Sequence, residues 1–446
     1  MRIIIAGAGD VGFHLAELLA FEKQDIVLVD KNQEVLDYAG THLDVLTLRG
    51  DAASIQTLEQ AEVQNANLLL AVTTSDKTNL MTAILAKKLG ARTVIARVNN
   101  EDYINPNYQE TICSLGIDHL ISPRQLAAAE IERLIRQCSF TDVFEFEEGK
   151  LTLLGVTLDN HSPLVDMQLR NIGDFQTEVD LRPMAILRGH RTIIPHGDTV
   201  LRRNDHIYFI TRPERKQKLE AIVGKQQQQV KRIMILGGSE LTISTAARLK
   251  DNYHITIIER DKGRCKDLTE KLSGVLVING DYSNFDLLEE EGLSRMDAFI
   301  ALTENSETNI IASLTAENHG VFKTIAQVEN KEYVHISQNI GVDTLINKKL
   351  LAANNIFRFV RKGRIEAITS LHGVDAEVIE YVLTKNNQLT RKPLKDLHLP
   401  KTAIIGGVIR GEQSLIPDGD FQLQLNDKVI VFALPEAINR LETLFR

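Results

Sequence analysis

A chain of 446 residues with 43% hydrophobic and 25% charged residues is long enough for roughly two to four globular domains. It contains no run of about 18 apolar residues that could span a bilayer, and its N-terminus lacks the features of a secretory signal, so a cytoplasmic protein is expected. The net charge of −9 argues against a nucleic-acid-binding protein, and the three scattered cysteines, Cys113, Cys138 and Cys265, indicate no metal cluster.

The segment 1–140 alternates between short apolar runs and amphipathic stretches. Five runs have the length and continuity of strands buried on both faces, at 2–7, 25–30, 45–50, 68–73 and 93–98. Between them, residues 12–24 and 80–90 carry apolar side chains at the three- and four-residue spacing of helices. Because parallel strands need crossover helices, an α/β fold with a Rossmann-like, doubly wound parallel sheet is predicted.

The segment GAGDVG, from Gly7 to Gly12, follows the first strand and opens the first helix. A GxGxxG pattern alone is weak, but here the acid Asp30 ends the second strand, at the spacing from the turn that is typical of dinucleotide-binding sites. Gly7 permits the tight turn, Gly9 lets the backbone approach a pyrophosphate, and Gly12 lets the helix pack on the sheet. Asp30 is expected to bind ribose hydroxyls and to repel a 2′-phosphate, which favours NAD or an adenosine di- or triphosphate over NADP. A glycine turn that only packs a helix on a strand is the structural alternative.

Further candidate residues follow later strands of the same sheet. Asp51 comes after the third strand, where it either reaches the adenine side or caps the next helix. Thr73 and Thr74 end the fourth strand, at the carboxyl edge where ligands of open α/β sheets bind. Arg97 closes the fifth strand; it binds a phosphate of its own or a neighbouring subunit's ligand, or it forms a surface ion pair.

A different pattern follows the predicted sheet. The stretch from Ser122 predicts a helix with one apolar side, formed by Leu126, Ile131, Leu134 and Ile135. That side needs a partner surface from the matching half of the chain, from another subunit, or from the core of its own module. Short alternating segments then predict a small α+β module, and the polar, glutamine-rich stretch 213–232 is predicted to be a linker.

The second half of the chain repeats the first. KRIMILGGSELT from Lys231 matches MRIIIAGAGDVG from Met1, and the tail segment from Leu415 matches the one from Ile193 with a slightly smaller shift in numbering. The repeat predicts four domains: two Rossmann-like nucleotide-binding domains at 1–140 and 225–365, and two small α+β domains at 141–224 and 366–446. We call the latter two the first and second tail modules.

The second glycine turn departs from the pattern of the first. Gly237 is kept, but Ser239 and Thr242 stand where the second and third glycines stood, and the acid Glu259 again ends the next strand. Gln327 replaces the arginine of the fifth strand.

Two carboxylates, Glu304 and Glu307, are added nearby. With less positive and more negative charge, the second site is expected to bind a polyphosphate more weakly, to select another nucleotide, or to be partly structural.

The motifs of nucleotide chemistry are missing. A dehydrogenase needs a proton-transfer residue held against the nicotinamide. His190, His196 and His206 lie in turns or strands, and no acidic residue stands at a spacing that would indicate a catalytic pair with any of them. The sequence has no Walker lysine motif, GxSxG or HExxH. We therefore expect a protein that binds nucleotide without consuming it, with no catalytic residues and no metal ligands. An NAD-dependent oxidoreductase and a soluble nucleotide sensor that acts on another protein are the alternatives.

The paired arrangement, GAGDVG, the GD after the third strand, the TxxDxTN segment from Thr73, and PxGD with NDxIxF in the first tail module resemble the regulator-of-potassium-conductance (RCK) family. The duplicated form is similar to the bacterial Trk-type potassium-uptake regulators. This resemblance implies a cytosolic gating-ring subunit, a homotetramer, held at the inner face of the membrane by a Trk-type potassium transporter or channel. It implies NAD(H), ATP or ADP as ligands.

The candidate contact residues fall into two sets. In the first half they are Gly7, Ala8, Gly9, Asp10, Val11, Gly12, Asp30, Lys31, Asp51, Ala52, Thr73, Thr74 and Arg97. In the second half they are Gly237, Ser239, Glu240, Leu241, Glu259, Asp281 and Thr303.

Overall fold

The computed structural model describes residues 1–446 except 22–23, 148, 159–161, 172–180, 190, 225–228, 331–332, 334–343, 362–367, 371–375, 398 and 446. The chain divides into two compact units, Met1–Glu130 with Ile346–Val360, and Ile131–Leu345 with Arg361–Arg446. Among the described residues, no helix combines the length and the apolar composition needed to cross a membrane. The predicted domain limit between 365 and 366, the limit at 225 and His190 lie outside the described residues.

Unit 1 is built on a six-stranded parallel sheet with the order β3-β2-β1-β4-β5-β6. Its strands are β1 (Arg2–Ala6), β2 (Asp25–Asp30), β3 (Leu46–Arg49), β4 (Leu68–Ala71), β5 (Thr93–Arg97) and β6 (His119–Ile121). Ile3 pairs with both Ile26 and Leu68, so β1 is central and the strand order reverses beside it. The first five strands were predicted; β6 was not, because three residues with one buried side chain carry no periodic signal.

Helices connect these strands. They are α1 (Asp10–Phe21), α2 (Gln33–His42), α3 (Ile55–Gln60), α4 (Asp76–Lys88) and α5 (Pro106–Ser114). The predicted helices at 12–24 and 80–90 correspond to α1 and α4, and both begin earlier than predicted. A cluster of buried residues that includes Ile4, Val29, Leu58 and Leu69 forms part of the core on one face of the sheet.

Each sheet is followed by a helix that leaves it. The helix α6 (Pro123–Arg136) begins in unit 1 and ends in unit 2, where Glu132 forms a 3.1 Å ion pair with Arg248. Its apolar residues Ile131, Leu134 and Ile135 are buried within the single chain.

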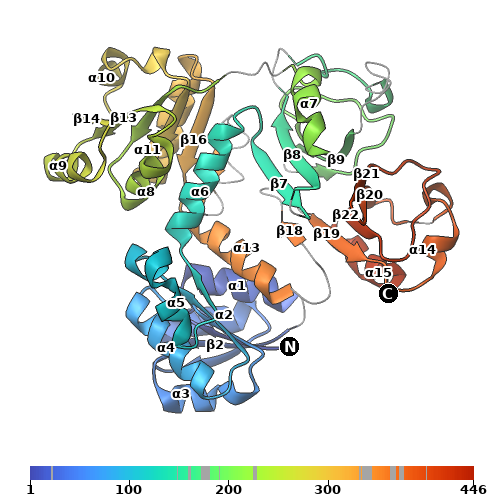
Figure 1. Cartoon of the computed structure of the whole chain (residues 1–446), viewed down its shortest axis with the longest axis horizontal. Helices are drawn as coiled ribbons and strands as arrows, with labels where there is room; N and C mark the ends of the chain where they lie inside the picture. Colours follow the sequence, from blue (N-terminus) through green and yellow to red (C-terminus); the bar gives the residue numbers. More distant parts are fainter. Residues whose placement is uncertain are drawn as a thin grey trace. The chain divides into compact units, whose positions relative to one another are not determined.

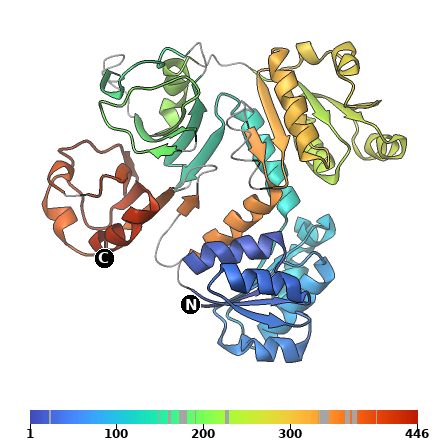
Figure 2. The same cartoon turned by 180° about the vertical axis from the view of Figure 1, so that it is seen from behind.

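The matching helix α13 (Lys348–Arg361) lies in unit 1 up to Val360, beside α1 (Figures 1 and 2). There Lys349 Nζ is 2.6 Å from Asp10 Oδ2. The end of α6 thus contacts the second half of the chain through Glu132, and α13 contacts the first half through Lys349.

Unit 2 contains a second six-stranded sheet in the same order, β14-β13-β12-β15-β16-β17. Its strands are β12 (Arg232–Leu236), β13 (His254–Glu259), β14 (Leu276–Asn279), β15 (Ala298–Ala301), β16 (Lys323–Gln327) and β17 (Thr344–Ile346). The described helices between them are α8 (Glu240–Leu249), α9 (Lys262–Lys271), α10 (Phe285–Glu290) and α11 (Ser306–Asn318). The internal repeat of the sequence is therefore a repeat of the fold.

The tail modules are two antiparallel five-stranded sheets, ordered β10-β9-β11-β8-β7 and β18-β19-β22-β20-β21. The first has β7 (Asp142–Phe146), β8 (Leu151–Thr157), β9 (Leu181–Arg188), β10 (Arg191–Ile193) and β11 (His206–Thr211). The second has β18 (Ile368–Ser370), β19 (Glu377–Val382), β20 (Ala403–Arg410), β21 (Gln413–Leu415) and β22 (Lys428–Ala433), with helices α14 (Gln388–Arg391) and α15 (Pro435–Phe445). The α+β class predicted for both modules is confirmed.

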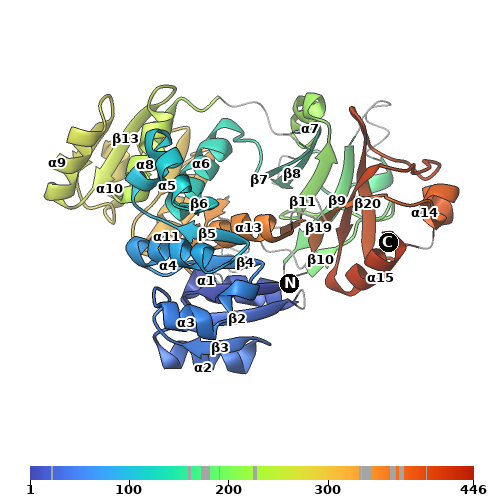
Figure 3. The same cartoon turned by 60° about the horizontal axis from the view of Figure 1, so that its bottom comes forward.

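The two tail modules share a hydrophobic core. Met184, Tyr208 and Ile210 of the first pack in one cluster with Val378 and Phe432 of the second, and Figure 3 shows the two sheets side by side. A Cβ on Gly406 would lie 2.2 Å from the Met184 sulfur, so any larger residue there would force the Met184 side chain to move. The duplication therefore produces an interface as well as two copies.

The predicted linker at 213–232 is wrong in its first half. Residues Lys216–Ile222 form α7, and Leu219, Ile222 and Val223 are buried in the core of the first tail module. Three apolar side chains on one side of a short helix are enough to dock it, although the stretch is polar in composition.

Candidate functional site

The glycine turn after β1 leaves its outer side open. Gly7 has φ +110°, and a Cβ there would lie 2.8 Å from the Thr73 backbone nitrogen. A Cβ on Gly12 would lie 1.8 Å from the Gly7 carbonyl oxygen, whereas one on Gly9 would meet no described atom within 4 Å. Gly7 and Gly12 are thus required by packing, while Gly9 faces open space in front of the α1 N-terminus, where free N–H groups favour an anion.

Asp30 lies beside this turn at the end of β2. Its Oδ2 accepts a 2.7 Å hydrogen bond from the Ala8 N–H, and its Oδ1 accepts a 2.9 Å bond from Asn32 N–H. A carboxylate offers about four acceptor positions, so capacity remains for ribose hydroxyls. The backbone thus orients the Asp30 carboxylate toward the turn.

Asp51 does not cap the following helix, so that alternative is wrong. The N-cap residue of α3 is Ser54, and Asp51 instead accepts a 3.0 Å bond from the Ala53 N–H. Asp51 Oδ2 also lies 3.1 Å from Lys31 Nζ. The Ala53 N–H and the Lys31 ammonium hold the pKa of the Asp51 carboxyl below its usual value.

A buried side-chain amide holds the ends of the fourth and fifth strands together. Asn79 Oδ1 accepts hydrogen bonds from the Thr73 N–H at 2.8 Å and from the Thr73 hydroxyl at 2.6 Å. Its Nδ2 donates to the carbonyl oxygens of Thr73 and Arg97, both at 2.9 Å. Asn309 makes the same four contacts in the second half, so the final asparagine of TxxDxTN is the available sequence signal.

We expect Asn79→Ala to lower the free energy of unfolding by about 1–3 kcal/mol, because it leaves buried polar groups of Thr73 and Arg97 without partners. Hydrogen exchange at the amides of β4 and β5 measures the loss locally. Thr82→Val is the matched control: Thr82 lies buried on the same helix, and its hydroxyl has no hydrogen-bond partner in the described part of the chain. Equal stability losses in the two variants would contradict the role given to Asn79.

The other candidate residues of the first half differ in how far they are buried. The side chains of Ala8, Val11 and Ala52 are buried, so these residues can offer only backbone groups to a ligand. Thr74 is exposed, and Arg97 is half-buried at the end of β5. The structure therefore gathers the turn, Asp30 and Thr73 at the carboxyl edge where the strand order reverses, the usual ligand position in such sheets.

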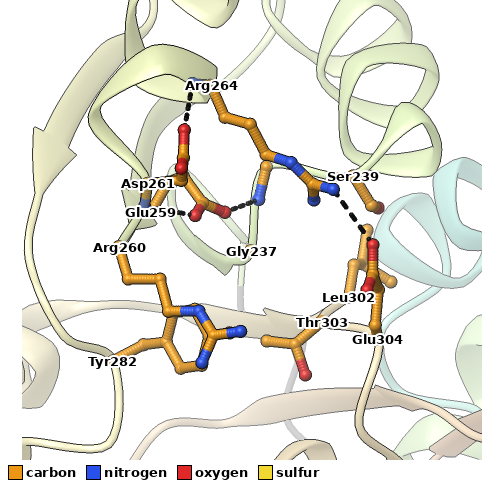
Figure 4. Close-up of a pocket in the computed structure, with 11 residues that line it drawn as sticks. Gly237, Ser239, Glu259, Arg260, Asp261, Arg264, Tyr282, Leu302, Thr303 and Glu304 are labelled. Atoms are coloured by element: carbon orange, nitrogen blue, oxygen red, sulfur yellow. Dashed lines mark hydrogen bonds and ion pairs between the residues drawn. The ribbon is translucent and has the colours of Figure 1, made fainter.

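The second half contains a cavity of about 180 Å³ at the equivalent edge (Figure 4). Of the predicted residues, Gly237, Ser239, Glu259 and Thr303 line it. The other three candidates, Glu240, Leu241 and Asp281, and the added acid Glu307 are not among the lining residues. Glu307 instead accepts a hydrogen bond from the Tyr333 hydroxyl, which lowers its pKa.

Hydroxyl side chains replace the missing glycines in this turn. Ser239 is the N-cap residue of α8 and accepts a 3.3 Å bond from the Thr242 N–H. The Thr242 hydroxyl donates to the Gly237 carbonyl oxygen at 2.7 Å. The second helix therefore packs on its strand through a side-chain hydrogen bond, where the first uses Gly12.

The second site carries positive charge that the comparison of Gln327 with Arg97 left out. Arg260 and Arg264 both line the cavity, and neither was singled out, although both follow the acid-ended strand closely. Arg260 lies over the Tyr282 ring, with Cζ 5.6 Å from the ring centroid. Arg264 Nη2 is 3.1 Å from Glu304 Oε1, and this contact raises the pKa of Arg264.

The acid of the second site is oriented as in the first. Glu259 accepts hydrogen bonds from the Gly238 N–H and, at 2.7 Å, from the Asp261 N–H. Burial raises the pKa of Tyr282 beside it.

The interpretation of His206 as an unpartnered histidine is wrong. Its Nε2 lies 3.1 Å from Asp142 Oδ2, and its Nδ1 lies 2.9 Å from the Thr157 hydroxyl. Burial, with Asp142 adding to it, raises the pKa of the neighbouring Tyr208 well above its usual value. Since both ring nitrogens contact side chains of the same sheet, the cluster is a structural contact of the first tail module. His196 is exposed.

Comparison with protein families identifies the repeated parts. The TrkA-N domain model matches residues 3–123 and 233–348, and the TrkA-C domain model matches 153–224 and 378–446. A Trk system potassium uptake protein TrkA homolog of Archaeoglobus fulgidus is 36% identical over 448 residues, covering both chains completely. The Trk system potassium uptake protein TrkA of Halomonas elongata is 33% identical and covers 100% of this chain and 99% of its own.

Solved structures with the same fold are more distant in sequence. The GsuK RCK domain superposes with a TM-score of 0.60 at 17% identity and covers 100% of this chain and 94% of its own. The GsuK channel bound to NAD has a TM-score of 0.60 at 16% identity, and the match covers 100% of this chain and 78% of the GsuK chain. At this identity the likeness establishes the fold: tandem Rossmann-like domains, each followed by a small α+β domain.

Proposed function

The chain belongs to the TrkA family of tandem TrkA-N and TrkA-C proteins, and on that premise we propose that it is the nucleotide-binding regulatory subunit of a Trk-type potassium-uptake system. Its relatives carry the name Trk system potassium uptake protein over their full length. Nucleotide binding at the first site then alters ion flux through a membrane partner, and the nucleotide is not consumed.

One observation carries the nucleotide part of the proposal. The α1 N-terminus, the open side of Gly9 and the oriented Asp30 carboxylate meet at the point where the strand order reverses. This combination provides amide donors for phosphates and an acceptor for ribose hydroxyls. NAD(H) and ATP or ADP are the proposed ligands, with the first-half candidate residues as their contacts and Arg97 as a phosphate partner.

The first experiment is calorimetric titration of the full chain with NADH, NAD, ATP and ADP, followed by chromatography of the ligands. Saturable binding with intact ligand supports a regulator. Turnover of the ligand would instead favour the NAD-dependent oxidoreductase. Repeating the titration beside a potassium-flux assay with the reconstituted transporter separates a Trk regulator from a sensor that acts on another soluble protein.

We expect Asp30→Asn to weaken NAD binding at the first site by roughly tenfold or more, because it removes charge-assisted hydrogen bonds to the ribose. NADP binding should fall less, since the variant no longer repels the 2′-phosphate, so the preference for NAD over NADP narrows. Asp25→Asn is the matched control, since Asp25 begins the same strand at its opposite end and is exposed. An unchanged NAD-to-NADP preference in Asp30→Asn would count against the assignment.

Conformational linkage supplies the mechanism of regulation. A ligand shifts an equilibrium between two shapes only by the difference in its affinity for them. We propose that the subunits form a homotetrameric gating ring in the cytoplasm, on the inner face of the membrane, and that the ring transmits this difference to the transporter. Of the four proposed domains, 1–140 and 225–365 are the nucleotide-binding domains, and 141–224 and 366–446 are the tail modules.

A further inference from the structure

The second site has an ion pair at two positions that are uncharged in the first site. Arg264, near the start of α9, extends across the cavity to Glu304, which follows β15, and the two groups are 3.1 Å apart (Figure 4). Arg264 lies three residues after the N-cap residue of its helix, and the corresponding residue of α2 is Val35. Thr74 corresponds to Glu304. This ion pair is therefore a feature of the second site alone.

The helix N-terminus at this site has less to offer a pyrophosphate. Ser239 uses its hydroxyl to accept the Thr242 N–H, so one of the first amides of α8 is already satisfied. The Ser239 side chain also stands where Gly9 leaves open space in the first half. A ligand of this site must therefore find its phosphate partner elsewhere in the cavity.

A flat surface is available for a base. Arg260 lies over the Tyr282 ring, and both residues line the cavity. The corresponding positions in the first half hold Lys31 and Ala52, which provide no such surface. Guanidinium and phenol planes stack on nucleobases.

The size of the cavity limits the ligand. Its volume of about 180 Å³ lies below the roughly 300–1,000 Å³ of typical small-molecule sites. We propose that the second site binds a nucleoside monophosphate, whose phosphate replaces the Glu304 carboxylate on Arg264 while its base lies against Arg260 and Tyr282. This inference rests on the proposed nucleotide-binding function and gives the second site a ligand different from that of the first.

The exchange of partners on Arg264 is energetically reasonable. The side chains of Arg264 and Glu304 are 49% and 78% exposed, and ion pairs at such exposure are weak. A phosphate carries more charge than a carboxylate and matches the guanidinium fork. Glu304 thus holds Arg264 in place until a ligand with the right anionic group arrives, and it disfavours ligands that lack one.

The test is calorimetric titration of the full chain with AMP and with adenosine. Arg264→Gln should weaken AMP binding by about tenfold or more and leave adenosine binding unchanged, because only the phosphate contact is lost. Glu304→Gln should strengthen AMP binding about two- to fivefold, since the competing carboxylate is gone. Lys266→Gln is the matched control; it removes the same charge from the same helix, but Lys266 faces Glu270 and does not line the cavity.

The Gly12→Thr background, in which α1 is displaced and its N-terminal amides no longer reach a ligand of the first site, separates this inference from the function on which it rests. AMP binding that survives Gly12→Thr and is weakened by Arg264→Gln supports the inference. AMP binding that is lost in Gly12→Thr but unchanged in Arg264→Gln overturns it and leaves the proposed function standing. Tighter binding of NAD than of AMP in the Gly12→Thr background also overturns it. Failure of the unmodified chain to bind either NADH or AMP overturns both.

Discussion

A Gly12→Thr variant is expected to lose nucleotide binding at the first site while the protein remains folded. The new Cβ would lie 1.8 Å from the Gly7 carbonyl oxygen and 3.4 Å from Val72 Cγ2, so α1 must move away from β1. Its N-terminal amides then no longer reach the phosphates, and losing two charge-assisted hydrogen bonds of about 1.5–3 kcal/mol each weakens binding by at least a hundredfold. Titration calorimetry with NADH measures the loss.

The second half explains why this variant should fold. There Thr242 occupies the equivalent position and donates its hydroxyl to the Gly237 carbonyl oxygen at 2.7 Å, so this fold accommodates a threonine. We expect an overpacking cost of about 1–3 kcal/mol. Gly40→Ala is the control, since a Cβ there meets only Thr47 side-chain atoms at 3.6 Å and beyond; it should leave NADH binding intact. Wild-type affinity in Gly12→Thr would mean that the glycine turn only packs the helix.

The largest loss of stability is expected when the buried aspartate of a tail module is removed. Asp205 is completely buried and accepts hydrogen bonds from the Nε and Nη2 of Arg188, both at 2.7 Å, and from the Arg202 N–H at 2.8 Å. The Asp205 carboxylate also raises the pKa of Arg188. Asp205→Ala leaves the guanidinium and the amide without this partner and should cost about 3–5 kcal/mol.

Hydrogen exchange at the amides of β9 and β11 measures this loss locally, which suits a chain of several domains whose unfolding is not two-state. The repeat supplies a second test, because Asp427 binds Arg410 and the Gln424 N–H in the same way. Asp198→Ala is the control, since Asp198 pairs with Arg170 on the surface with 78% of its side chain exposed; such a pair contributes about 0–1 kcal/mol. Equal effects of Asp205→Ala and Asp198→Ala would contradict the buried role.

The same geometry explains the Asn-Asp pair that opens NDxIxF in the first tail module and NDKVIV in the second. Asn204 and Asn426 have φ of +63° and +67°, a left-handed conformation that asparagine tolerates better than most residues. The turn they form directs the next residue, the aspartate, inward to its arginine. The motif was visible in the sequence, but its role depends on Arg188 and Arg410, each 17 residues before its aspartate.

Several predictions failed where the deciding contact is distant in the sequence. His206 and Asp142 come from the last and the first strand of their module, and they meet because β7 and β11 both border β8. The α7 stretch is polar overall, and only the core of the first tail module reveals why Leu219 is buried. Arg264 and Glu304 likewise meet across 40 residues, so the charges near the second turn did not reveal that an arginine lies in the cavity.

By itself, the sequence determined the repeat, the parallel sheets and the glycine turn with its acid, because each rests on local chemistry: continuous apolar strands, backbone that only glycine permits, and an acid at the end of the neighbouring strand. The tertiary structure alone decided which side chains meet. It placed the end of α6 in the unit of the second sheet, α13 in the unit of the first, and Arg264 across the second cavity. Such contacts depend on register and packing between distant segments, and no local pattern of residues encodes them.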